Sequence, residues 1–473
     1  MANSSGARTE KDSMGELQVP ADAYYGAQTV RAMHNFPISG RPMPRAFIRA
    51  HATLKKAAAR VNRELNLLDQ RRADAIVAAV DEIMAGELAD QFPVDIYQTG
   101  SGTSTNMNLN EVIASRANEL LGGKRGDKSP VHPNDHVNMG QSSNDTIPTS
   151  LHIAALTEIQ RELKPGLQAL EDSLGKKSRE LWNVIKTGRT HLQDATPIRL
   201  GQEFLGYQGQ LKRAERRVAF ATVELLELAI GGTAVGTGIN AHPKFAPRVC
   251  DLLSLEVRIP LRETDNHFQA QSALDGAVMV SGVMKSIAVT LTKIANDIRW
   301  MGCGPRAGLG EIEVPAVQPG SSIMPGKVNP VIAESVLMVC QRVIGNDVTI
   351  TAAASSGNFE LLVAMPVIAE ALLESITLLG RCAENFAEQC IDGIVATRRG
   401  PESVEAGLML GTALAPVIGY EAAAAIAKEA AKTGRTIREV AREKTQLSEA
   451  QLTDLLNPEK MVEPSDRVLP VSG

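Results

Sequence analysis

Aromatic side chains are scarce in this chain, since tryptophan, tyrosine and phenylalanine make up only 3% of its 473 residues. β-Sandwiches draw heavily on aromatic and β-branched residues. Small apolar residues, chiefly alanine, glycine, valine and leucine, are abundant here instead, and they allow long helices to pack closely. The composition therefore predicts a mainly α-helical protein rather than a β-sandwich.

Cysteine is also rare, and the few thiols are scattered along the chain. The sequence has no Cys-x-x-Cys pair and no histidine at a metal-ligand spacing from a cysteine. This pattern argues against a disulfide framework and a zinc site, and it is typical of reduced intracellular thiols. We therefore expect no metal, and we expect core positions for the five cysteines, Cys250, Cys303, Cys340, Cys382 and Cys390.

A strong charge imbalance is missing as well. The formal net charge is -5 and no block of basic residues occurs, which argues against nucleic acid or an anionic membrane as the main partner. The first twenty residues lack the apolar segment of a secretory signal, so we expect a cytoplasmic protein. The most apolar stretch, Ala277–Leu291, is interrupted by Ser281, Gly282, Lys285 and Ser286, and predicts a buried helix rather than a membrane span.

Apolar residues recur at spacings of three and four along most of the chain, which is the pattern of amphipathic helices. The pattern predicts two helices within Ala46–Met84 and long helices over Leu156–Leu174, Phe204–Leu228, Ala273–Trp300, Pro330–Val348 and Pro366–Cys390. Pro165 predicts a kink in the first of the long helices. Shorter helices are predicted over Glu421–Lys432, Thr436–Glu443 and Ser448–Leu456. Residues 1–45 are polar and rich in turn residues, so we expect an irregular arm there.

The chain is longer than an ordinary single domain. We expect an N-terminal helical domain over residues 1–145, a central helical-bundle domain over 146–400 and a small C-terminal helical domain over 401–473. The helix predicted over Ala273–Trp300 is apolar on nearly all sides, and other subunits would most easily cover such a helix. The sequence therefore predicts a symmetric oligomer.

The segment Gly320–Glu334 combines two adjacent serines, a lysine and an asparagine with four glycine or proline residues. Glycine frees the backbone and proline restricts it, so such a segment can close over a ligand and hold one shape when closed. Composition alone favours an ordinary surface loop, because serine and lysine are usually solvated. A reactive loop is the alternative.

Other polar segments stand at predicted junctions of helices and loops. Thr99–Thr105 is rich in hydroxyls and precedes a helix, so its free backbone N–H groups can bind an anion, although simple helix capping explains it equally well. Gly231–Gly238 is a turn that a substrate or another backbone approaches closely. Neither segment has the pattern of a P-loop or of a dinucleotide fingerprint. Val131–Thr149 and Lys186–Pro197 are further polar breaks.

The motifs of several enzyme classes are missing, namely HExxH, Walker A, GxSxG and paired cysteines. The groups that gather in the polar segments are hydroxyls, carboxamides, histidine, one lysine and one glutamate. Such a set suits a small dicarboxylate, because lysine and N–H donors hold the carboxylates while other groups move a proton. No cofactor is expected.

Seven motifs together carry a family resemblance over nearly the whole chain. They occur in the order TGSGTSTNMNLNEV, HPNDHVN, QSSNDTIPT, GRTHLQDATP, GGTAVGTG, KIANDIRWMGCGPR and GSSIMPGKVNPVIAE. The chain resembles the class II fumarate hydratases of the fumarase/aspartase superfamily. The resemblance implies a three-domain, mainly helical subunit whose central five-helix bundles assemble into a twenty-helix homotetramer, with each active site built from three subunits. It also implies reversible hydration of fumarate to (S)-malate in the tricarboxylic acid cycle.

The resemblance implies roles for individual residues. His191 would exchange the proton of the hydroxyl that leaves as water, Glu334 would orient it, and Ser321 would be the base for the C3 proton. Lys327 and Asn329 would bind the substrate carboxylate. The same pocket would be lined by Ser101, Gly102, Thr103, Ser142, Ser143, Asn144, Thr190, Ser322 and Val328. A second, non-catalytic anion site would consist of His132, Pro133, Asn134 and Asp135.

Residue chemistry supports these roles unequally. Serine is a poor base unless its alkoxide is stabilised, so residue type alone ranks Ser321 below His191 for proton transfer. Three departures from the family pattern also matter. Leu362 replaces a usual asparagine near the pocket, His136 replaces a usual aspartate, and Ser129 or Pro130 stands where an arginine is frequent. The last two concern the second anion site more than catalysis.

Two alternatives remain. Aspartate ammonia-lyases use the same loop, but they usually carry glutamine at the position of His191, which favours the hydratase. A catalytically silent structural protein on this scaffold would not require Ser321, Lys327, Asn329 and Glu334 together.

Overall fold

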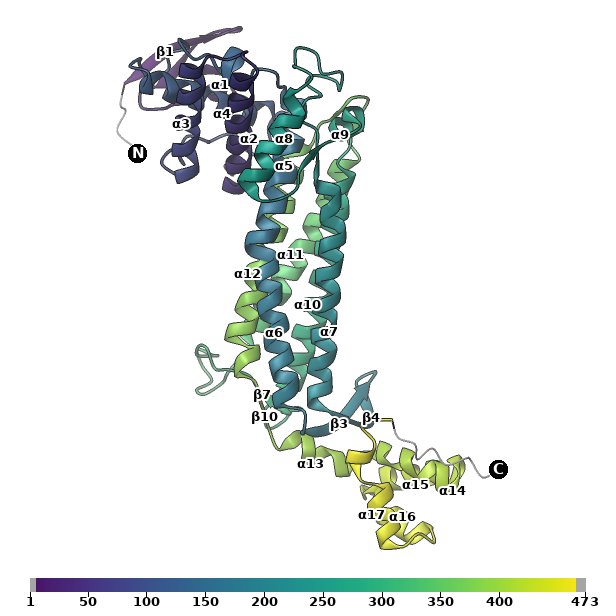
Figure 1. Ribbon diagram of the computed structural model, residues 1–473. Coiled ribbons are helices and arrows are strands. Elements are labelled where there is room, and N and C mark those ends of the chain that lie inside the picture. Colours follow the sequence, from purple (N-terminus) through teal and green to yellow (C-terminus); the bar gives the residue numbers. More distant parts are fainter. Residues whose placement is uncertain (1–5, 465–473) are drawn as a thin grey trace. The chain divides into compact units, whose positions relative to one another are not determined.

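The computed structural model describes residues 6–464 (Figure 1). Most of these residues are helical, and they form seventeen α-helices and five two-stranded sheets. They divide into two compact units. Unit 1 comprises the described chain up to Pro165 together with Glu215–Ala288 and Gln341–Gly380, and unit 2 comprises Gly166–Ala214, Val289–Cys340 and the described chain from Arg381 onward. The prediction of a mainly α-helical protein is confirmed.

Unit 1 begins with a hairpin and then collects helices around α2. Its elements include β1 (Ala7–Asp12), β2 (Gly15–Pro20), α1 (Ala27–Asn35), α2 (Arg45–Glu64), α3 (Gln70–Ala85), α4 (Thr103–Leu120), α5 (Ser143–Glu158), α8 (Phe245–Val257) and α9 (His267–Ser272). Helix α2 packs against α3, α5 and α8, and its apolar face is buried at Phe47, Leu54, Ala58 and Val61. The two helices predicted within Ala46–Met84 are therefore confirmed as α2 and α3.

The prediction of an irregular arm over residues 1–45 is wrong for much of this stretch, while residues 1–5 lie outside the described part. Antiparallel β1 and β2 pair from Ala7 with Pro20 to Asp12 with Gly15, and α1 follows. The N-terminus of α1 is capped from α4, where the Glu111 carboxylate accepts hydrogen bonds from the N–H groups of Gly26, Gln28 and Thr29. This cap lies far away in the sequence, so local composition could not reveal it.

Five long helices follow, close to the predicted positions. They are α6 (Lys164–Glu180), α7 (Leu200–Thr222), α10 (Asp275–Met301), α11 (Val331–Ala354) and α12 (Met365–Gln389). The sequence predicted a kink at Pro165, which lies in the first turn of α6. The structure has a π-helical turn over Ile159–Leu163, which joins α5 to α6 and ends two residues before the proline. Proline has no N–H for the carbonyl of Arg161, so the backbone here departs from regular α-helix.

Neighbouring long helices touch within each unit. In unit 2, the Tyr207 hydroxyl of α7 donates to Asp297 of α10 at 2.9 Å. In unit 1, Ser281 of α10 donates to Asp347 of α11 at 2.8 Å, and Asn346 of α11 donates to the Ala371 carbonyl of α12 at 3.2 Å. These contacts are those of a helical bundle.

Helix α10 is long and apolar enough to cross a membrane by length and composition, a test that core helices also pass. Half of its most apolar window is buried within the single chain. Val289 and Trp300 remain 57% and 52% exposed, so part of its apolar surface is uncovered in this chain.

The C-terminal helices of unit 2 confirm the three short predicted helices. The segment contains α13 (Arg399–Ala406), α14 (Ala415–Ile418), α15 (Tyr420–Thr433), α16 (Ile437–Lys444) and α17 (Glu449–Leu455). Thr436 and Ser448 cap α16 and α17 in capping boxes with Glu439 and Gln451. These helices enclose a core that includes Leu414, Ile426, Val440 and Leu452.

The remaining strands are short. Unit 2 holds the antiparallel hairpin of β3 (Ile185–Thr190) and β4 (Gln193–Arg199) and the antiparallel pair of β7 (Ile312–Glu313) and β10 (Val395–Ala396). Unit 1 holds the parallel pair of β5 (Glu227–Leu228) and β6 (Arg262–Glu263) and the antiparallel pair of β8 (Gly357–Asn358) and β9 (Leu361–Leu362).

The five cysteines are free thiols, and all except the partly exposed Cys303 are buried. Burial raises the pKa of Cys250, Cys382 and Cys390 to about 12. These three thiols are therefore protonated and unreactive at neutral pH, as expected for residues that fill a core.

Candidate functional site

The loop from Gly320 to Asn329 in unit 2 is folded back on itself. A Cβ atom on Gly320 would lie 2.1 Å from the Lys327 carbonyl oxygen, so only glycine allows this approach. The Asn329 side chain donates to the Gly320 carbonyl at 2.6 Å, and Gly326 takes a positive φ of 80°. The two ends of the loop are thus closed, while Lys327 and Val328 between them are exposed.

The Ser321 hydroxyl stands inside a turn of this loop. Its Oγ accepts hydrogen bonds from the N–H groups of Ile323 at 3.2 Å and Met324 at 2.9 Å. Two donors aimed at one oxygen favour negative charge on it. This arrangement supplies what residue type alone did not, namely a means of stabilising a serine alkoxide. Ser322 is exposed beside it, and Glu334 lies in the first turn of α11.

His191 lies at the tip of the hairpin formed by β3 and β4, where the sequence predicted only a break. Thr190 pairs with Gln193, so His191 and Leu192 form a two-residue turn. Their φ angles are 55° and 59°, and such turns usually use asparagine and glycine. Two larger residues in the left-handed region strain the backbone, which is a feature of functional sites. Thr190 and His191 are both exposed.

Unit 2 contains both the His191 turn and the Gly320–Glu334 segment. Within its described part, no hydrogen bond or ion pair joins Thr190 or His191 to the segment Gly320–Glu334.

Unit 1 does bring two of the predicted segments together. Gly102, with φ of 73°, precedes α4, and a Cβ on it would lie 3.0 Å from the Ile147 side chain of α5. Asn106 of α4 donates to the buried Ser143 hydroxyl of α5 at 3.1 Å. The N-terminal ends of α4 and α5 are therefore adjacent, and Ser101 and Thr103 share a hydrogen bond of 2.8 Å at this place.

Asp145 is a residue of this region that the sequence reasoning gave no role. Its buried carboxylate accepts hydrogen bonds from the N–H groups of Ser142, Gly231 and Thr233 at 2.9, 3.1 and 2.9 Å. Burial raises the pKa of Asp145 to about 6. The Asn144 amide also donates to the Ala234 carbonyl at 2.7 Å. The Gly231–Gly238 turn is thus bound to the start of α5, where Ser142 forms a capping box with Asp145.

A buried lysine lies beneath the same helix start and was also missed. Lys55 donates to the side-chain oxygens of Asn138 and Gln141, both at 2.9 Å, and burial lowers its pKa to about 7. His51 contacts Ser150 and Asn106, and burial lowers its pKa well below the usual value. Buried charge and amide groups in one network hold the loop before α5 in a single conformation.

The lowered pKa of Lys55 predicts a pH-dependent stability. Between the folded value of about 7 and the ordinary 10.5, the unfolded chain binds a proton at Lys55 and the folded chain does not. The free energy of unfolding therefore gains a contribution as pH rises through this window. We expect the Tm of the unsubstituted protein minus the Tm of Lys55→Met to increase from pH 7 toward 10.5. Circular dichroism measures both Tm values.

A neighbouring lysine offers the control. Although burial alone lowers the pKa of Lys56, hydrogen bonds to Asp81 and Glu256 raise it overall. Lys56→Met should therefore give a Tm difference that stays level across the same window. A level difference for Lys55→Met as well would contradict the assignment.

The residues predicted as a second anion site form one compact turn. His132 Nδ1 accepts hydrogen bonds from the N–H groups of Asn134 and Asp135 at 3.2 and 3.3 Å, and Pro133 begins the π-helical turn Pro133–Val137. With Nδ1 as acceptor, the proton of the neutral tautomer lies on Nε2. The Asp135 carboxylate approaches Nδ1 to 3.4 Å. The side chains of Asn134 and Asp135 are exposed.

Three positions that depart from the family pattern, those of His136, Pro130 and Leu362, are each held by contacts of the fold. His136 Nδ1 accepts from the His132 N–H at 2.7 Å, and burial lowers the pKa of His136. Arg72 of α3 donates to the Pro130 carbonyl at 2.7 Å, so an arginine reaches this segment from another helix. Leu362 is fully buried in β9.

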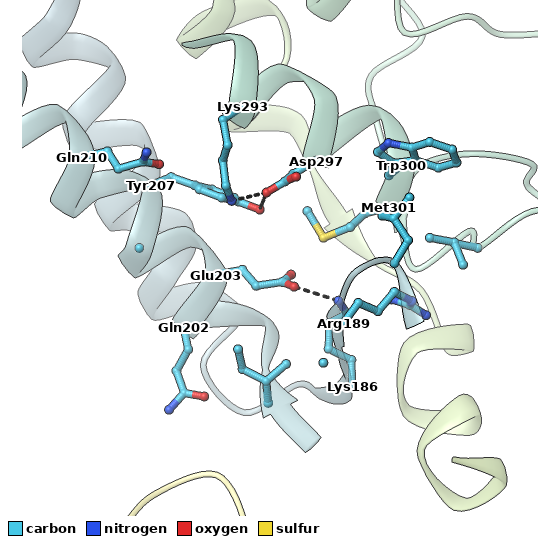
Figure 2. A pocket seen from close by; sticks show the side chains of 15 residues that line it. Lys186, Arg189, Gln202, Glu203, Tyr207, Gln210, Lys293, Asp297, Trp300 and Met301 are labelled. Carbon is cyan, nitrogen blue, oxygen red and sulfur yellow. Dashed lines mark hydrogen bonds and ion pairs between the residues drawn. The ribbon is translucent and has the colours of Figure 1, made fainter. Parts of the chain in front are cut away.

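A further cluster in unit 2 borders a cavity of about 480 Å³ (Figure 2). Lys186 and Arg189 of β3 and Glu203 of α7 line the cavity on one side, while Tyr207, Lys293 and Asp297 contact one another on the other. Glu311 pairs with both cations of β3. The sequence gave no signal for this cluster beyond the charges themselves.

Known proteins resemble this chain over almost its full length. A family model described as lyase matches residues 15–345, and one described as fumarase C C-terminus matches residues 410–463. The chain is 54% identical over 455 residues to the class II fumarate hydratase of Halobacterium salinarum, which covers 96% of this chain and 97% of that protein.

Solved structures agree with these matches. A recombinant class II fumarase from Schistosoma mansoni superposes with a TM-score of 0.94 at 39% identity, covering 96% of this chain and 99% of the other. A fumarate lyase:delta crystallin from Brucella melitensis bound to cobalt gives a TM-score of 0.93 at 48% identity, covering 97% and 100%. Among residues 6–464 of this chain, no group of three or more histidine, cysteine, aspartate or glutamate residues is placed to hold a metal.

Proposed function

The chain belongs to the class II fumarate hydratase family and is a hydro-lyase, and we propose that it interconverts fumarate and (S)-malate through the residues described above. The observation that carries the proposal is the Ser321 hydroxyl, which accepts two backbone hydrogen bonds beside an exposed lysine. The reaction is an anti addition or elimination of water, as used in the tricarboxylic acid cycle. A cytoplasmic location is part of the proposal.

In the direction of dehydration, Ser321 takes the C3 proton of malate. Carbon-bound hydrogen is weakly acidic, so the adjacent carboxylate must carry the developing charge as an aci form. Lys327 and Asn329 hold that carboxylate, and the closed loop presents the lysine to solvent from a fixed backbone. The N–H groups of Ile323 and Met324 stabilise the Ser321 alkoxide that the step requires.

His191 gives a proton to the C2 hydroxyl, which leaves as water while the C2–C3 double bond forms. Glu334 orients the imidazole. The proposal assigns binding of the substrate to Ser101, Gly102, Thr103, Ser142, Ser143, Asn144, Thr190, Ser322 and Val328. In unit 1, the adjacent N-terminal ends of α4 and α5 support this assignment, since helix N-termini attract carboxylates.

The proposal includes a homotetramer with active sites shared by three subunits and a three-domain subunit divided near residues 145 and 400. Two observations support sharing. His191 makes no polar contact with Gly320–Glu334 in the described part of unit 2. Apolar side chains of the long helices are uncovered, with Met338 and Val348 of α11 exposed by 63% and 64%.

The turn at His132–Asp135 would serve as the second anion site.

The purified protein should produce fumarate from (S)-malate and not from L-aspartate. Water elimination requires a group that protonates a hydroxyl, which His191 provides, and nothing in the site is assigned to an amine leaving group. Fumarate formation is followed by its ultraviolet absorbance with each substrate separately. Turnover of aspartate alone would establish the ammonia-lyase instead, and turnover of neither would favour the structural role.

A further inference from the structure

Glu311 is a buried carboxylate that the mechanism above leaves without a role. Only 2% of its side chain is exposed. Its backbone is fixed on both sides, because its N–H donates to the Met301 carbonyl at the end of α10 and its carbonyl accepts from the Thr397 N–H. The carboxylate therefore projects from a rigid part of unit 2.

Both oxygens of Glu311 bind cations of strand β3. Oε1 accepts from Arg189 at 2.8 Å, and Oε2 lies 3.0 Å from the Lys186 ammonium. Lys186, which is also 2% exposed, makes a second contact with Glu203 of α7 at 2.9 Å. Figure 2 shows Glu203 joined to Lys186 by a dashed line, with Arg189 nearby on the same hairpin. The carboxylates of Glu311 and Glu203 thus neutralise the cations Lys186 and Arg189 where water is largely excluded.

The hairpin needs such an anchor because its tip is exposed and strained. His191 and Leu192 take φ angles of 55° and 59°, and Leu192 is 65% exposed. The pairing of β3 with β4 shifts register between Thr187 and Arg189, which alters the direction of the strands just before the tip. The position of His191 is therefore set by what holds β3 at Lys186 and at Arg189, two residues before the imidazole.

We propose that Glu311 is a positioning residue for His191, which it fixes through Arg189 and Lys186 without touching the imidazole. This inference rests on the proposed function, in which His191 moves a proton at the substrate hydroxyl. A proton donor must lie within hydrogen-bond reach of the group it protonates, so a small displacement of the hairpin lowers turnover.

Glu311→Gln tests the inference, because a carboxamide keeps the shape but offers only one acceptor oxygen to two cations. With malate as substrate, kcat should fall roughly 10- to 100-fold, the scale of a displaced catalytic group, while KM stays within about threefold. The limb of the kcat pH profile that reports His191 should keep its midpoint. A shifted midpoint would indicate a direct charge effect on the imidazole and would overturn the positioning role.

Glu203→Gln is the matched control. It removes one partner of Lys186 but leaves Arg189 and Lys186 bound to Glu311, so its kcat should fall by less than about threefold. Equal losses in Glu203→Gln and Glu311→Gln would mean that the cluster acts only through general stability, and the inference would fail.

Arg189→Met provides a second route if Glu311→Gln does not fold, since it breaks the Arg189 contact and keeps the Lys186 pair. It should show the same loss of kcat with KM retained, and the double variant with Glu311→Gln should lose less than the product of the single effects.

If the unsubstituted protein does not convert malate, the proposed function fails. If the unsubstituted protein converts malate, and Glu311→Gln and Arg189→Met both keep full kcat, only the positioning role fails.

Discussion

Replacing His191 with asparagine should lower kcat for malate dehydration by about 10²-fold or more, the scale of a lost general acid or base. The substitution removes the imidazole that gives a proton to the leaving hydroxyl. Asparagine suits the position because it tolerates the left-handed φ of 55° better than other non-glycine residues, so the turn is preserved. Steady-state kinetics and circular dichroism on the same samples give turnover and folding together.

A substitution at the neighbouring tip residue, Leu192, shows whether the loss of kcat comes from the missing imidazole or from a distorted hairpin turn. Leu192 has nearly the same backbone angle, 59°, and has no role in the proposed chemistry. Leu192→Asn should therefore keep kcat within about twofold. Equal losses in both variants would point to the turn rather than to the imidazole, and full activity in His191→Asn would remove His191 from the mechanism.

Replacing Ser321 with alanine should lower kcat by about 10²- to 10³-fold, because the base for the C3 proton is lost and its two backbone donors face no oxygen. KM should change little if the carboxylates are held by Lys327 and its neighbours. Single-turnover measurements with malate check the chemical step directly. Ser321→Ala with unchanged turnover would assign the base to another group.

Ser322→Ala is the natural comparison, since it removes the adjacent hydroxyl. Ser322 is assigned to binding rather than to proton transfer, so its loss should act mainly on KM. The opposite result, a large fall in kcat for Ser322→Ala and none for Ser321→Ala, would exchange the two roles.

Mixed assemblies of the two inactive variants test whether sites are shared. If His191 and Ser321 of one site come from different subunits, subunits that carry His191→Asn and Ser321→Ala can combine their intact residues. Random co-assembly should then restore about a quarter of full activity, since one site in four receives both residues intact. Mixtures that remain inactive after confirmed subunit exchange would place both residues of a site on the same subunit.

The helices could be predicted from the sequence because burial of one helix face leaves a local record. The repeat of apolar residues located α2, α3 and the long helices, and the residues Thr436 and Ser448 marked two helix starts by their side chains. The N-terminal region was misread because α1 is capped by Glu111, 85 residues beyond Gly26. A pattern read over neighbouring residues cannot record such a partner.

For the proposed site, the sequence predicted which residues take part but not the contacts that they make. The motifs predicted roles for His191 and Ser321, and these roles remain predictions. The turn at His191 could not be predicted, because it lacks the Asn-Gly pair that usually marks a two-residue hairpin. The donors that favour a charged Ser321 are backbone groups, which no residue letter reveals. Arg189 and Glu311 stand 122 residues apart, and their pairing depends on the fold alone.

The carboxylate of Asp145 has one further consequence. It binds the backbone at Ser142 and, through the same side chain, at Gly231 and Thr233, which lie 86 to 88 residues further along the chain. None of these segments can open without giving up a hydrogen bond to a buried acid, so local unfolding at one releases the others. The start of α5 and the glycine-rich turn therefore behave as a single cooperative element, and their amide protons should exchange with solvent in the same opening event.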